Sequence, residues 1–444
     1  MLSAEDNELL TRVGPGTPLG SFMRQYWIPA VGSGDLELDG VPYRIRLLGE
    51  DLLAFRDTDG RVGVVEPFCA HRRAPLYFGR NEECGLRCVY HGWKFDVTGQ
   101  CVDMPNEPAD STFKSKVSIG SYPARERGGV VWVYMGGATP PELPDFEWAS
   151  VDAAQCHVSF RVQECNWLQA LEGEIDSSHG PFLHSRIDGR SSTVMSLAYS
   201  MTDRRPRFEV LDTDYGVAIA ARRNVDGDDT SYYWRVQQYL FPFYTMVPPG
   251  SRYPTIGGHA WVPIDDNETL AVCFSYHPAT PLAEKVLTIF RDGTRDGRES
   301  GHLTSAGASP ERDPRLPYNA HRSRYSVTND FGIDWEDQRT THFSGLPGPW
   351  PQDAACQVGM GPIVDRTQER LGSTDAGIVR VRRSLKRALT KMTKEGLAPA
   401  SAVDPSLFRV RSVGMTLPRE VGWVEGTAPH RKADGQDFAY TVPS

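Results

Sequence analysis

Short runs of apolar and β-branched residues, separated by turn residues, dominate the first third of the chain. Two such runs, 52–56 and 61–65, flank Asp59-Gly60, a strong two-residue hairpin signal. The same pattern returns at 93–97, at 100–102 after Thr98-Gly99, and in the apolar run 130–134. This pattern predicts an all-β unit over residues 40–138, preceded by an N-terminal segment over 1–39.

A proline-rich stretch, Pro140-Pro141-Glu142-Leu143-Pro144, marks the end of this unit, because it can continue neither a helix nor a central strand. Beyond it the pattern is mixed. It predicts a helix over 167–178, strands at 208–211, 217–222, 232–240, 260–262 and 270–276, and a late helix with the apolar stripe Ile378, Val381, Leu385, Leu389 and Met392. The prediction is therefore an α+β domain with an antiparallel sheet over 139–396.

Two further segments lack such periodicity. Residues 291–327 are rich in Gly, Ser, Arg, Asp and Pro, which is typical of a long surface excursion. Residues 397–444 are predicted to form an irregular C-terminal tail.

Composition and charge narrow the classes of function. The chain has 444 residues, and no run approaches the ~18 consecutive apolar residues that a membrane span needs. A net charge of −9 argues against nucleic acid as a partner, because phosphate neutralisation needs a basic surface. The first residues are acidic where a secretory signal is basic, so we expect a cytoplasmic protein. Eight cysteines are too few for a disulfide scaffold, and only their spacing is informative.

One pair of segments in the β unit combines cysteine with histidine. Cys69-Ala70-His71 is followed, after sixteen residues, by Cys88-Val89-Tyr90-His91-Gly92-Trp93. In a Rieske [2Fe–2S] centre two thiolates hold one iron and two imidazoles the other, so each loop must supply one ligand of each kind. A structural Cys₂His₂ zinc site accepts the same residue types, and ordinary buried thiols and histidines are the simplest alternative. The other six cysteines lack this pairing and are predicted to be small buried residues.

A second group of candidate ligands lies where the mixed domain begins. Asp176 and His179 are three residues apart, which places them on one face of a helix. Gly180-Pro181 is predicted to break that helix, so that His184 turns back toward the same point. Two imidazoles and one carboxylate suit a non-haem Fe(II) centre with open positions for dioxygen. Spacing alone does not choose the carboxylate.

Both segments resemble Rieske non-haem iron oxygenases. The cysteine–histidine segments match the family's Rieske signature, with Ala70 and Arg73 where Pro and Gly are usual, and Asn166 to His184 is similar to its iron-binding segment. Gln352-Asp353, with the residues after Met360, is similar to the phthalate dioxygenase branch. The resemblance implies cluster ligands Cys69, His71, Cys88 and His91, and iron ligands His179, His184 and Asp353, with Asp365 as the second choice for the carboxylate.

The resemblance also implies a fold, an assembly and a partner. The second domain should have the helix-grip (START-like) fold. Asp176 should link the iron site to a Rieske histidine of a neighbouring subunit, in a head-to-tail homotrimer or a hexamer. The chain has no Gly-rich dinucleotide fingerprint, so an NAD(P)H-dependent flavin and iron–sulfur reductase should supply the electrons. A Rieske ferredoxin, the electron-carrier alternative, would end near residue 140.

The expected activity is that of a terminal oxygenase acting on an aromatic carboxylate such as a phthalate or benzoate. Cis-dihydroxylation is the main expectation, and monohydroxylation or O-demethylation of an aryl ether is the alternative. Arginine suits bidentate carboxylate recognition. Among Arg204, Arg205, Arg207, Arg222 and Arg235, the candidates for the substrate pocket are Arg207 and Arg235, which have aromatic and β-branched neighbours.

Overall fold

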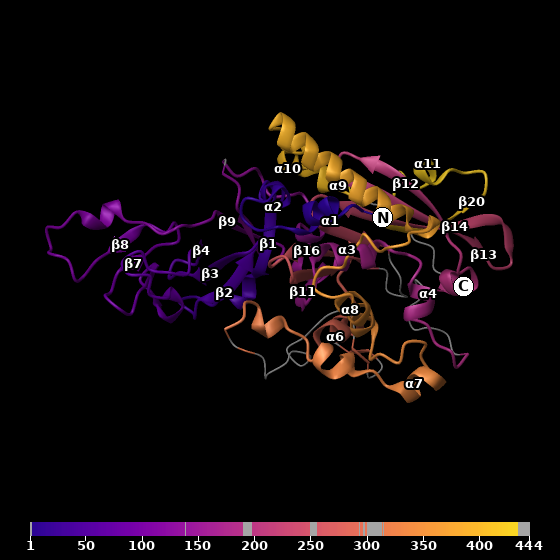
Figure 1. The fold of residues 1–444 in the computed structure, drawn as a ribbon, viewed down its shortest axis with the longest axis horizontal. Helices are drawn as coiled ribbons and strands as arrows, with labels where there is room; N and C mark the ends of the chain where they lie inside the picture. Colours follow the sequence, from indigo (N-terminus) through magenta and orange to yellow (C-terminus); the bar gives the residue numbers. More distant parts are fainter. Residues whose placement is uncertain are drawn as a thin grey trace.

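The structure is a computed structural model, and it describes residues 2–137, 139–189, 198–248, 255–292, 294–295, 298–299, 313 and 315–433. Figure 1 shows an elongated molecule, with a slender N-terminal β unit at one end and a broad sheet-and-helix body at the other. Much of the predicted surface excursion at 291–327 lies outside the described residues.

The N-terminal β unit consists of small antiparallel sheets. One contains β2 (Tyr43–Leu47), β3 (Glu50–Arg56) and β4 (Val62–Val65). A second contains β5 (Arg80–Glu82), β6 (Gly85–Arg87), β7 (Lys94–Phe95) and β8 (Cys101–Asp103). A third joins β1 (Trp27–Gly32), β10 (Val130–Tyr134) and β9 (Ala124–Arg127). The hairpins predicted around Asp59-Gly60 and Thr98-Gly99 are confirmed, and both glycines have positive φ.

A single antiparallel sheet organises the body. Its strand order is β11-β17-β16-β15-β14-β13-β12, and β20 pairs with β14. The strands are β11 (Cys156–Gln163), β12 (Arg207–Thr213), β13 (Gly216–Val225), β14 (Asp228–Leu240), β15 (Tyr244–Val247), β16 (Ile256–Pro263), β17 (Thr269–Tyr276) and β20 (Val413–Pro418), with the separate pair β18 (Thr294–Arg295) and β19 (Arg298–Glu299). The predicted α+β class and antiparallel sheet are confirmed.

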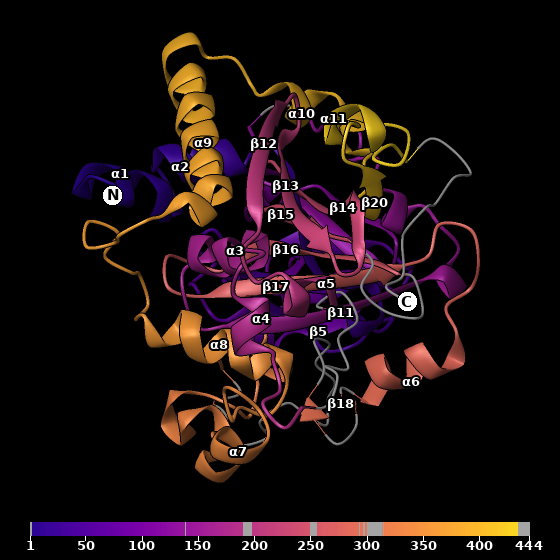
Figure 2. The ribbon, with the colours of Figure 1, turned by 90° about the vertical axis from the view of Figure 1, so that its right-hand side faces the viewer.

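Helices cover this sheet and its edges. They are α1 (Ala4–Thr11), α2 (Pro18–Met23), α3 (Trp167–Ile175), α4 (Gly180–Leu183), α5 (Ala198–Thr202), α6 (Glu284–Asp292), α7 (Trp335–Thr340), α8 (Pro349–Gly359), α9 (Ala376–Glu395), α10 (Ala400–Val403) and α11 (Trp423–Gly426). α3 packs on β15 and β16, and α9 packs on β12 and β13 (Figure 2). Among these helices, none has the length and apolarity that a membrane crossing requires.

The structure corrects three predictions. The helix predicted over 167–178 ends at Ile175, because Asp176 takes an extended backbone and its carboxylate accepts the Ser178 N–H. The predicted irregular tail is wrong for residues 413–418, which form β20 in the main sheet. Of the six cysteines predicted to be buried, Cys356 is exposed, and Cys84 and Cys156 are only half-buried. The domain limits at 39, 138 and 396 stay a prediction.

A buried ion-pair cluster links α3 to α9. Glu172 on α3 accepts hydrogen bonds from Arg382 on α9 and from Arg366, at 2.5 to 3.3 Å. Glu172 is 8% exposed, and both arginines are buried. The cluster holds in place the helix that leads directly into the predicted iron-binding segment.

Glu172→Ala is expected to destabilise the protein by about 3 to 5 kcal/mol, because it leaves Arg366 buried without a close anion and Arg382 with Glu369 alone. Urea unfolding followed by tryptophan fluorescence measures the effect. Asp212→Ala is the matched control: Asp212 also pairs with two arginines, Arg380 and Arg387, but at the surface. A surface pair is worth ~1 kcal/mol or less. Equal effects of the two substitutions would contradict the assigned role.

Candidate metal centres and active site

Two tight turns at the far end of the β unit carry the cysteine–histidine segments. In the first, the Cys69 N–H donates to the Ala74 carbonyl and the Arg73 N–H donates to the Cys69 carbonyl, both at 2.9 Å. In the second, the Gly92 N–H donates to the Cys88 carbonyl at 2.9 Å, and the Cys88 N–H donates to the Trp93 carbonyl at 2.8 Å. Each turn therefore presents its cysteine and its histidine from a fixed backbone.

Backbone conformation explains two residues of these turns. Gly92 has φ +79°, and a Cβ there would lie 2.5 Å from a carbon of Pro105, so only glycine fits without strain. Arg73 also has positive φ, at +59°. This is where related sequences usually have glycine, and the structure shows that the turn requires the left-handed conformation.

The side chains of the two turns converge. The His71 and His91 rings lie 4.4 Å apart between centroids, and Trp93 stacks on His71 at 4.5 Å. Cys69 and Cys88 are 1% and 2% exposed. The buried His71 Nδ1 has no hydrogen-bond partner among the described residues. Burial raises the pKa of the Cys69 thiol to about 11, so that a metal is needed to hold it as thiolate at neutral pH. This donor set fits a [2Fe–2S] cluster.

Cys88→Ser is expected to abolish or strongly alter the Rieske absorption and EPR spectra, because it replaces an inner-sphere thiolate. Cys101→Ser is the matched control. Cys101 is another buried thiol packed in the same small core, but it lies on β8 outside the two turns. An unchanged spectrum in Cys88→Ser would rule out the ligand assignment.

Three further ligand groups converge in the body of the molecule. His179 Nε2 lies 3.2 Å from His184 Nε2, and each lies 3.5 Å from Asp353 Oδ1. Donors bound about 2.1 Å from one metal ion are about 3.0 to 3.4 Å apart at right-angled to tetrahedral positions. Among the His, Cys, Asp and Glu side chains of the described residues, these three form the group whose ligand atoms all lie within 4.8 Å of one another. It fits a two-histidine, one-carboxylate iron site.

Two helices bring these ligands together. His179 precedes α4, His184 follows it, and Asp353 lies in α8, far away in the sequence. Gly180-Pro181 does not break a helix as predicted. Instead, it begins α4, where proline is tolerated because the first-turn N–H groups have no helical partner. The predicted approach of His184 to His179 is still found, but it results from the turn between α3 and α4 and from the short helix α4.

Neighbouring side chains orient the two imidazoles. Gln352 Oε1 lies 2.7 Å from His184 Nδ1, and the amide of the same residue donates to the Leu346 carbonyl. Asp176 Oδ2 lies 3.5 Å from His179 Nδ1. Both histidines therefore have an acceptor on Nδ1, which leaves Nε2 for the metal. In the sequence Gln352 was noted only as part of the Gln352-Asp353 motif, and its contact with His184 was not predicted.

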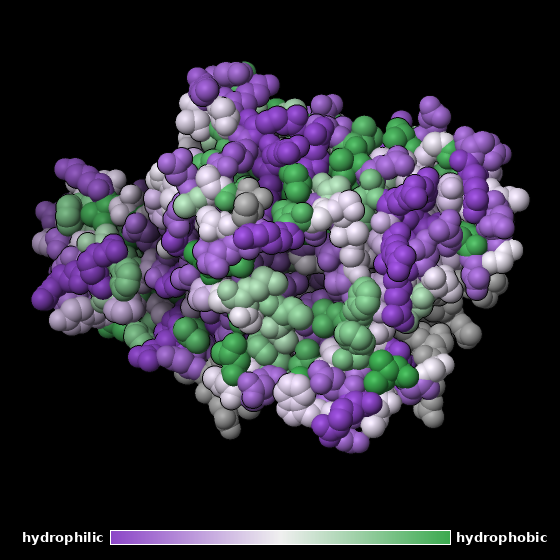
Figure 3. All heavy atoms as spheres, turned by 45° about the vertical axis from the view of Figure 1, so that its right-hand side comes forward, coloured by the Kyte–Doolittle hydropathy of each residue, from purple (hydrophilic) through white to green (hydrophobic). Residues whose placement is uncertain are grey.

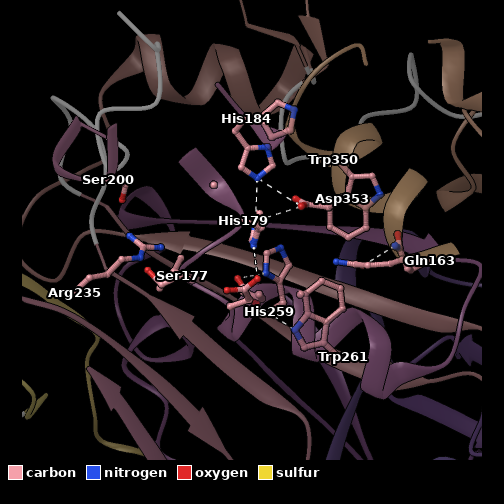
Figure 4. A pocket seen from close by; sticks show the side chains of 17 residues that line it. Gln163, Ser177, His179, His184, Ser200, Arg235, His259, Trp261, Trp350 and Asp353 are labelled. Carbon is pink, nitrogen blue, oxygen red and sulfur yellow. Dashed lines mark hydrogen bonds and ion pairs between the residues drawn. The ribbon is translucent and has the colours of Figure 1, made fainter. Parts of the chain in front are cut away.

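A cavity of about 260 Å³ opens beside this group (Figure 4). Arg235, His259, Trp261 and Trp350 line it together with the three ligand residues. The predicted pocket residue Arg207 is exposed on β12 and is not among the residues that line this cavity. Asp365 is exposed and accepts hydrogen bonds from Thr367 and Gln368, away from the ligand group.

Glu174 and His259 form a polar contact at the cavity wall that sequence reasoning missed. Glu174 Oε1 accepts from His259 Nδ1 at 2.6 Å, and Glu174 Oε2 accepts from Trp261 Nε1 at 3.1 Å. Burial alone would lower the pKa of His259, but the Glu174 carboxylate outweighs it and holds that pKa well above its usual range. Glu174 lies in the iron-binding segment, whereas no local motif marks His259.

The fold and the two ligand groups define a two-domain oxygenase with an iron–sulfur domain and a mononuclear metal domain. Comparisons with known proteins agree. Residues 26–123 match the Rieske [2Fe-2S] domain, and residues 133–291 and 312–439 match a family described as LigXa C-terminal domain like.

Curated relatives match along nearly the whole chain. The 3-chlorobenzoate-3,4-dioxygenase oxygenase subunit of Comamonas testosteroni is 38% identical, over 98% of this chain and 99% of the relative. The phthalate 4,5-dioxygenase oxygenase subunit of Pseudomonas putida is 37% identical, over 95% and 94%. The 5,5'-dehydrodivanillate O-demethylase oxygenase subunit of Sphingobium sp. is 31% identical, over 92% and 85%.

Solved structures share the fold. Dicamba monooxygenase bound to dicamba aligns with a TM-score of 0.56 at 20% identity, over 84% of this chain and 99% of that one. The terminal oxygenase of carbazole 1,9a-dioxygenase from Novosphingobium sp. KA1 aligns with a TM-score of 0.53 at 19% identity, over 86% and 98%. The chain belongs to the Rieske non-haem iron oxygenases, as an oxygenase subunit of the phthalate dioxygenase-like branch, with a [2Fe–2S] cluster and a mononuclear iron as cofactors.

Proposed function

We propose that this oxygenase hydroxylates an aromatic carboxylate, and that the reaction is cis-dihydroxylation. The observation that carries the proposal is a cationic side chain, Arg235, in a cavity that also contains His179, His184 and Asp353. Trp261 and Trp350 stack at 21° between ring planes and offer a flat apolar wall for an aromatic ring. A benzoate or phthalate has the charge and the shape that such a cavity accommodates.

Arg235 has the chemistry of a carboxylate anchor. Its Nη1 is buried and has no hydrogen-bond partner among the described residues. Burial removes water from the guanidinium group and thereby lowers the pKa of Arg235. An incoming anion would therefore stabilise the charged form of this side chain. Tyr233 is also in contact with it, which helps to fix the guanidinium group.

The names of the relatives support this class of substrate and also the alternative. Two relatives are named as dioxygenases of a chlorobenzoate and of phthalate. A third is named as an O-demethylase, which favours monooxygenation of an aryl methyl ether as the second candidate.

The residues divide between two metal centres. Cys69, His71, Cys88 and His91 would hold the cluster, and His179, His184 and Asp353 the iron. When bound, these groups supply one-electron transfer and dioxygen activation. The protein orients the iron-binding imidazoles through Gln352 and Asp176, binds the carboxylate through Arg235, and walls the ring off from water with Trp261 and Trp350.

The two centres lie at opposite ends of the molecule, the cluster turns beside β7 and the iron ligands at α4 (Figure 1). We therefore propose a head-to-tail trimer, or a hexamer of two trimers, in which Asp176 meets a Rieske histidine of the neighbouring subunit. Both ends carry exposed apolar side chains, which is typical of an interface: Val89 and Tyr90 at the cluster, Phe182 and Phe343 near α4. The face in Figure 3 mixes hydrophilic and hydrophobic patches, and other exposed apolar side chains include Val41, Trp335 and Val403.

The electron donor is proposed to be an NAD(P)H-dependent reductase with flavin and iron–sulfur groups. The chain itself has no nucleotide-binding fingerprint. Such a donor operates where NAD(P)H is available, and we place the system in the cytoplasm.

Arg235→Gln is expected to raise the KM for aromatic carboxylates by about 10- to 100-fold with a smaller change in kcat, because it removes a charged, bidentate partner of the carboxylate. Steady-state kinetics with a surrogate reductase measure this effect. Arg207→Gln is the matched control and should leave KM unchanged, because Arg207 is exposed on β12. If the two variants behave alike, Arg235 does not bind the carboxylate.

A substrate screen tests the proposal as a whole. Phthalates, benzoates and methoxybenzoates are supplied with a surrogate reductase and ¹⁸O₂, and product masses are recorded. Gain of two labelled oxygen atoms in a diol supports dihydroxylation, and loss of a methyl group supports the second candidate. Absence of turnover with every aromatic carboxylate, while an uncharged aromatic compound is oxidised, would contradict the proposed substrate class.

A further inference from the structure

His259 faces the substrate cavity from a strand that the metal ligands do not use. It lies on β16, and its register partner on β15 is Thr245. Residues paired across antiparallel strands share one face of the sheet, and alternate residues along a strand do so as well. By this rule Arg235 on β14, Thr245 and His259 lie on the same face, because Thr245 pairs with Tyr239, four residues after Arg235. This is the face that α3 covers.

A network of buried donors fixes the orientation of the His259 ring. The Glu174 carboxylate accepts from His259 Nδ1 at 2.6 Å, from Trp261 Nε1 at 3.1 Å and from the Thr245 hydroxyl. The Glu174 side chain is 10% exposed, so these donors replace most of its water. With Nδ1 bound to Glu174, Nε2 is the remaining ring nitrogen, and the His259 ring lines the cavity (Figure 4).

The chemistry of Nε2 follows from this partner. A carboxylate that accepts from Nδ1 stabilises the protonated ring, so Nε2 carries a proton and acts as a donor. The pKa of His259, raised by Glu174, agrees with this state. Cys273, the register partner of His259 on β17, also hydrogen-bonds to the ring and contributes to its raised pKa. A thiol is only a weak acceptor, so a substrate oxygen can take its place.

We propose that His259 is a specificity residue, which donates a hydrogen bond from Nε2 to a second, oxygen-bearing substituent of the aromatic carboxylate. Arg235 and His259 stand on strands two apart, about 10 Å across the sheet, and Arg235 is offset by four residues, about 13 Å, along its strand. A benzene ring fits between their side chains with its carboxylate at Arg235. The enzyme then selects aromatic carboxylates with a hydroxyl, alkoxyl or second carboxyl group over equally large apolar analogues. This inference rests on the proposed substrate class.

Glu174 acts as a positioning residue in this scheme. Both of its carboxylate oxygens already accept hydrogen bonds from side chains of the cavity wall, namely Thr245, His259 and Trp261, so neither oxygen is available to the substrate. Its effect on specificity passes through the orientation and charge of His259. Replacing Glu174 should therefore weaken the same preference that replacing His259 removes.

Binding to matched ligand pairs tests the inference. Dissociation constants of the ortho, meta and para hydroxybenzoates and of the corresponding methylbenzoates are measured by calorimetry on the iron-loaded, anaerobic protein. In the wild type, one hydroxyl isomer should bind about tenfold more tightly than its methyl analogue, since a buried donor left without an acceptor costs that much. His259→Leu should reduce this ratio to about one, with unchanged affinity for benzoate. His259→Gln, which keeps a donor, should restore part of the ratio, and Glu174→Gln should lower it.

Controls keep the outcomes distinct. His430→Gln replaces a histidine beyond α11, outside the cavity lining, and should behave as the wild type. An intact Rieske spectrum and full iron content establish that each variant is folded. A wild type that binds none of these carboxylates contradicts the proposed substrate class. A wild type that binds them all, with a hydroxyl-to-methyl ratio that His259→Leu leaves unchanged, overturns the role of His259 alone.

Discussion

Asp353→Ala is expected to lose mononuclear iron and to reduce turnover to below about 1% of the wild type, while the Rieske spectrum stays intact. Two imidazoles without the carboxylate bind Fe(II) poorly, because a hard oxygen donor and a compensating negative charge are both lost. Iron analysis after gel filtration, together with the visible spectrum, measures both centres in one sample. The wild type should contain three irons per chain and the variant two, as a [2Fe–2S] cluster alone accounts for two.

Asp365→Ala is the matched control for this prediction. Asp365 is the acid that the sequence offered as second choice, but its carboxylate accepts from Thr367 and Gln368 on an exposed turn. The control should keep its iron and its activity. Retained iron in Asp353→Ala together with loss in Asp365→Ala would transfer the role of ligand to Asp365.

Asp176→Asn is expected to slow electron transfer from the reduced cluster to the iron by about 100-fold or more, with both metals retained. The substitution keeps the volume of the side chain but removes the charge that meets His179 and, in the proposed trimer, a Rieske histidine of the neighbour. Rapid mixing of the reduced enzyme with dioxygen and substrate measures the rate of cluster oxidation in a single turnover.

The outcome separates a bridging residue from a structural one. Asp188→Asn is a suitable control, because Asp188 is another aspartate near α4, paired with Arg186 instead of an iron ligand. It should oxidise its cluster at the rate of the wild type. Single-turnover kinetics of Asp176→Asn that match the wild type, or a stable monomer with full activity, would contradict the bridge between subunits.

Local patterns in the sequence predicted the parts of the fold that depend on local forces. The hairpins at Asp59-Gly60 and Thr98-Gly99 follow from glycines at positive φ. The late helix was visible because Val381, Leu385 and Leu389 recur at helical spacing, and all three are buried against the sheet.

Other parts depend on contacts between distant residues. Residues 413–418 carry no strong strand pattern of their own, and they form β20 because an edge of β14 is available to pair with them. The early end of α3 at Ile175 reflects the Asp176 carboxylate, which competes for the backbone N–H of Ser178.

The site shows the same division. His179 and His184 could be found from spacing, because one chain turn brings them together, whereas Asp353 needed the family resemblance since it arrives from α8. Arg207 and Arg235 looked equivalent in sequence, but strand position left one in solvent and the other in the cavity. Glu174 and His259 come into contact because α3 packs on β16, and no local sequence pattern predicts that contact.

Subunit complementation tests most directly the central claim that the two metal centres of this oxygenase cooperate across a head-to-tail assembly. Cys88→Ser chains, without a functional cluster, are co-expressed with Asp353→Ala chains, without mononuclear iron, and the mixed assemblies are assayed for oxygenation of an aromatic carboxylate. Each variant alone should be inactive. Random mixing should restore about one quarter of wild-type turnover, because that fraction of interfaces joins an intact cluster to an intact iron site. Mixed assemblies of the proper size that stay as inactive as the single variants would contradict the account.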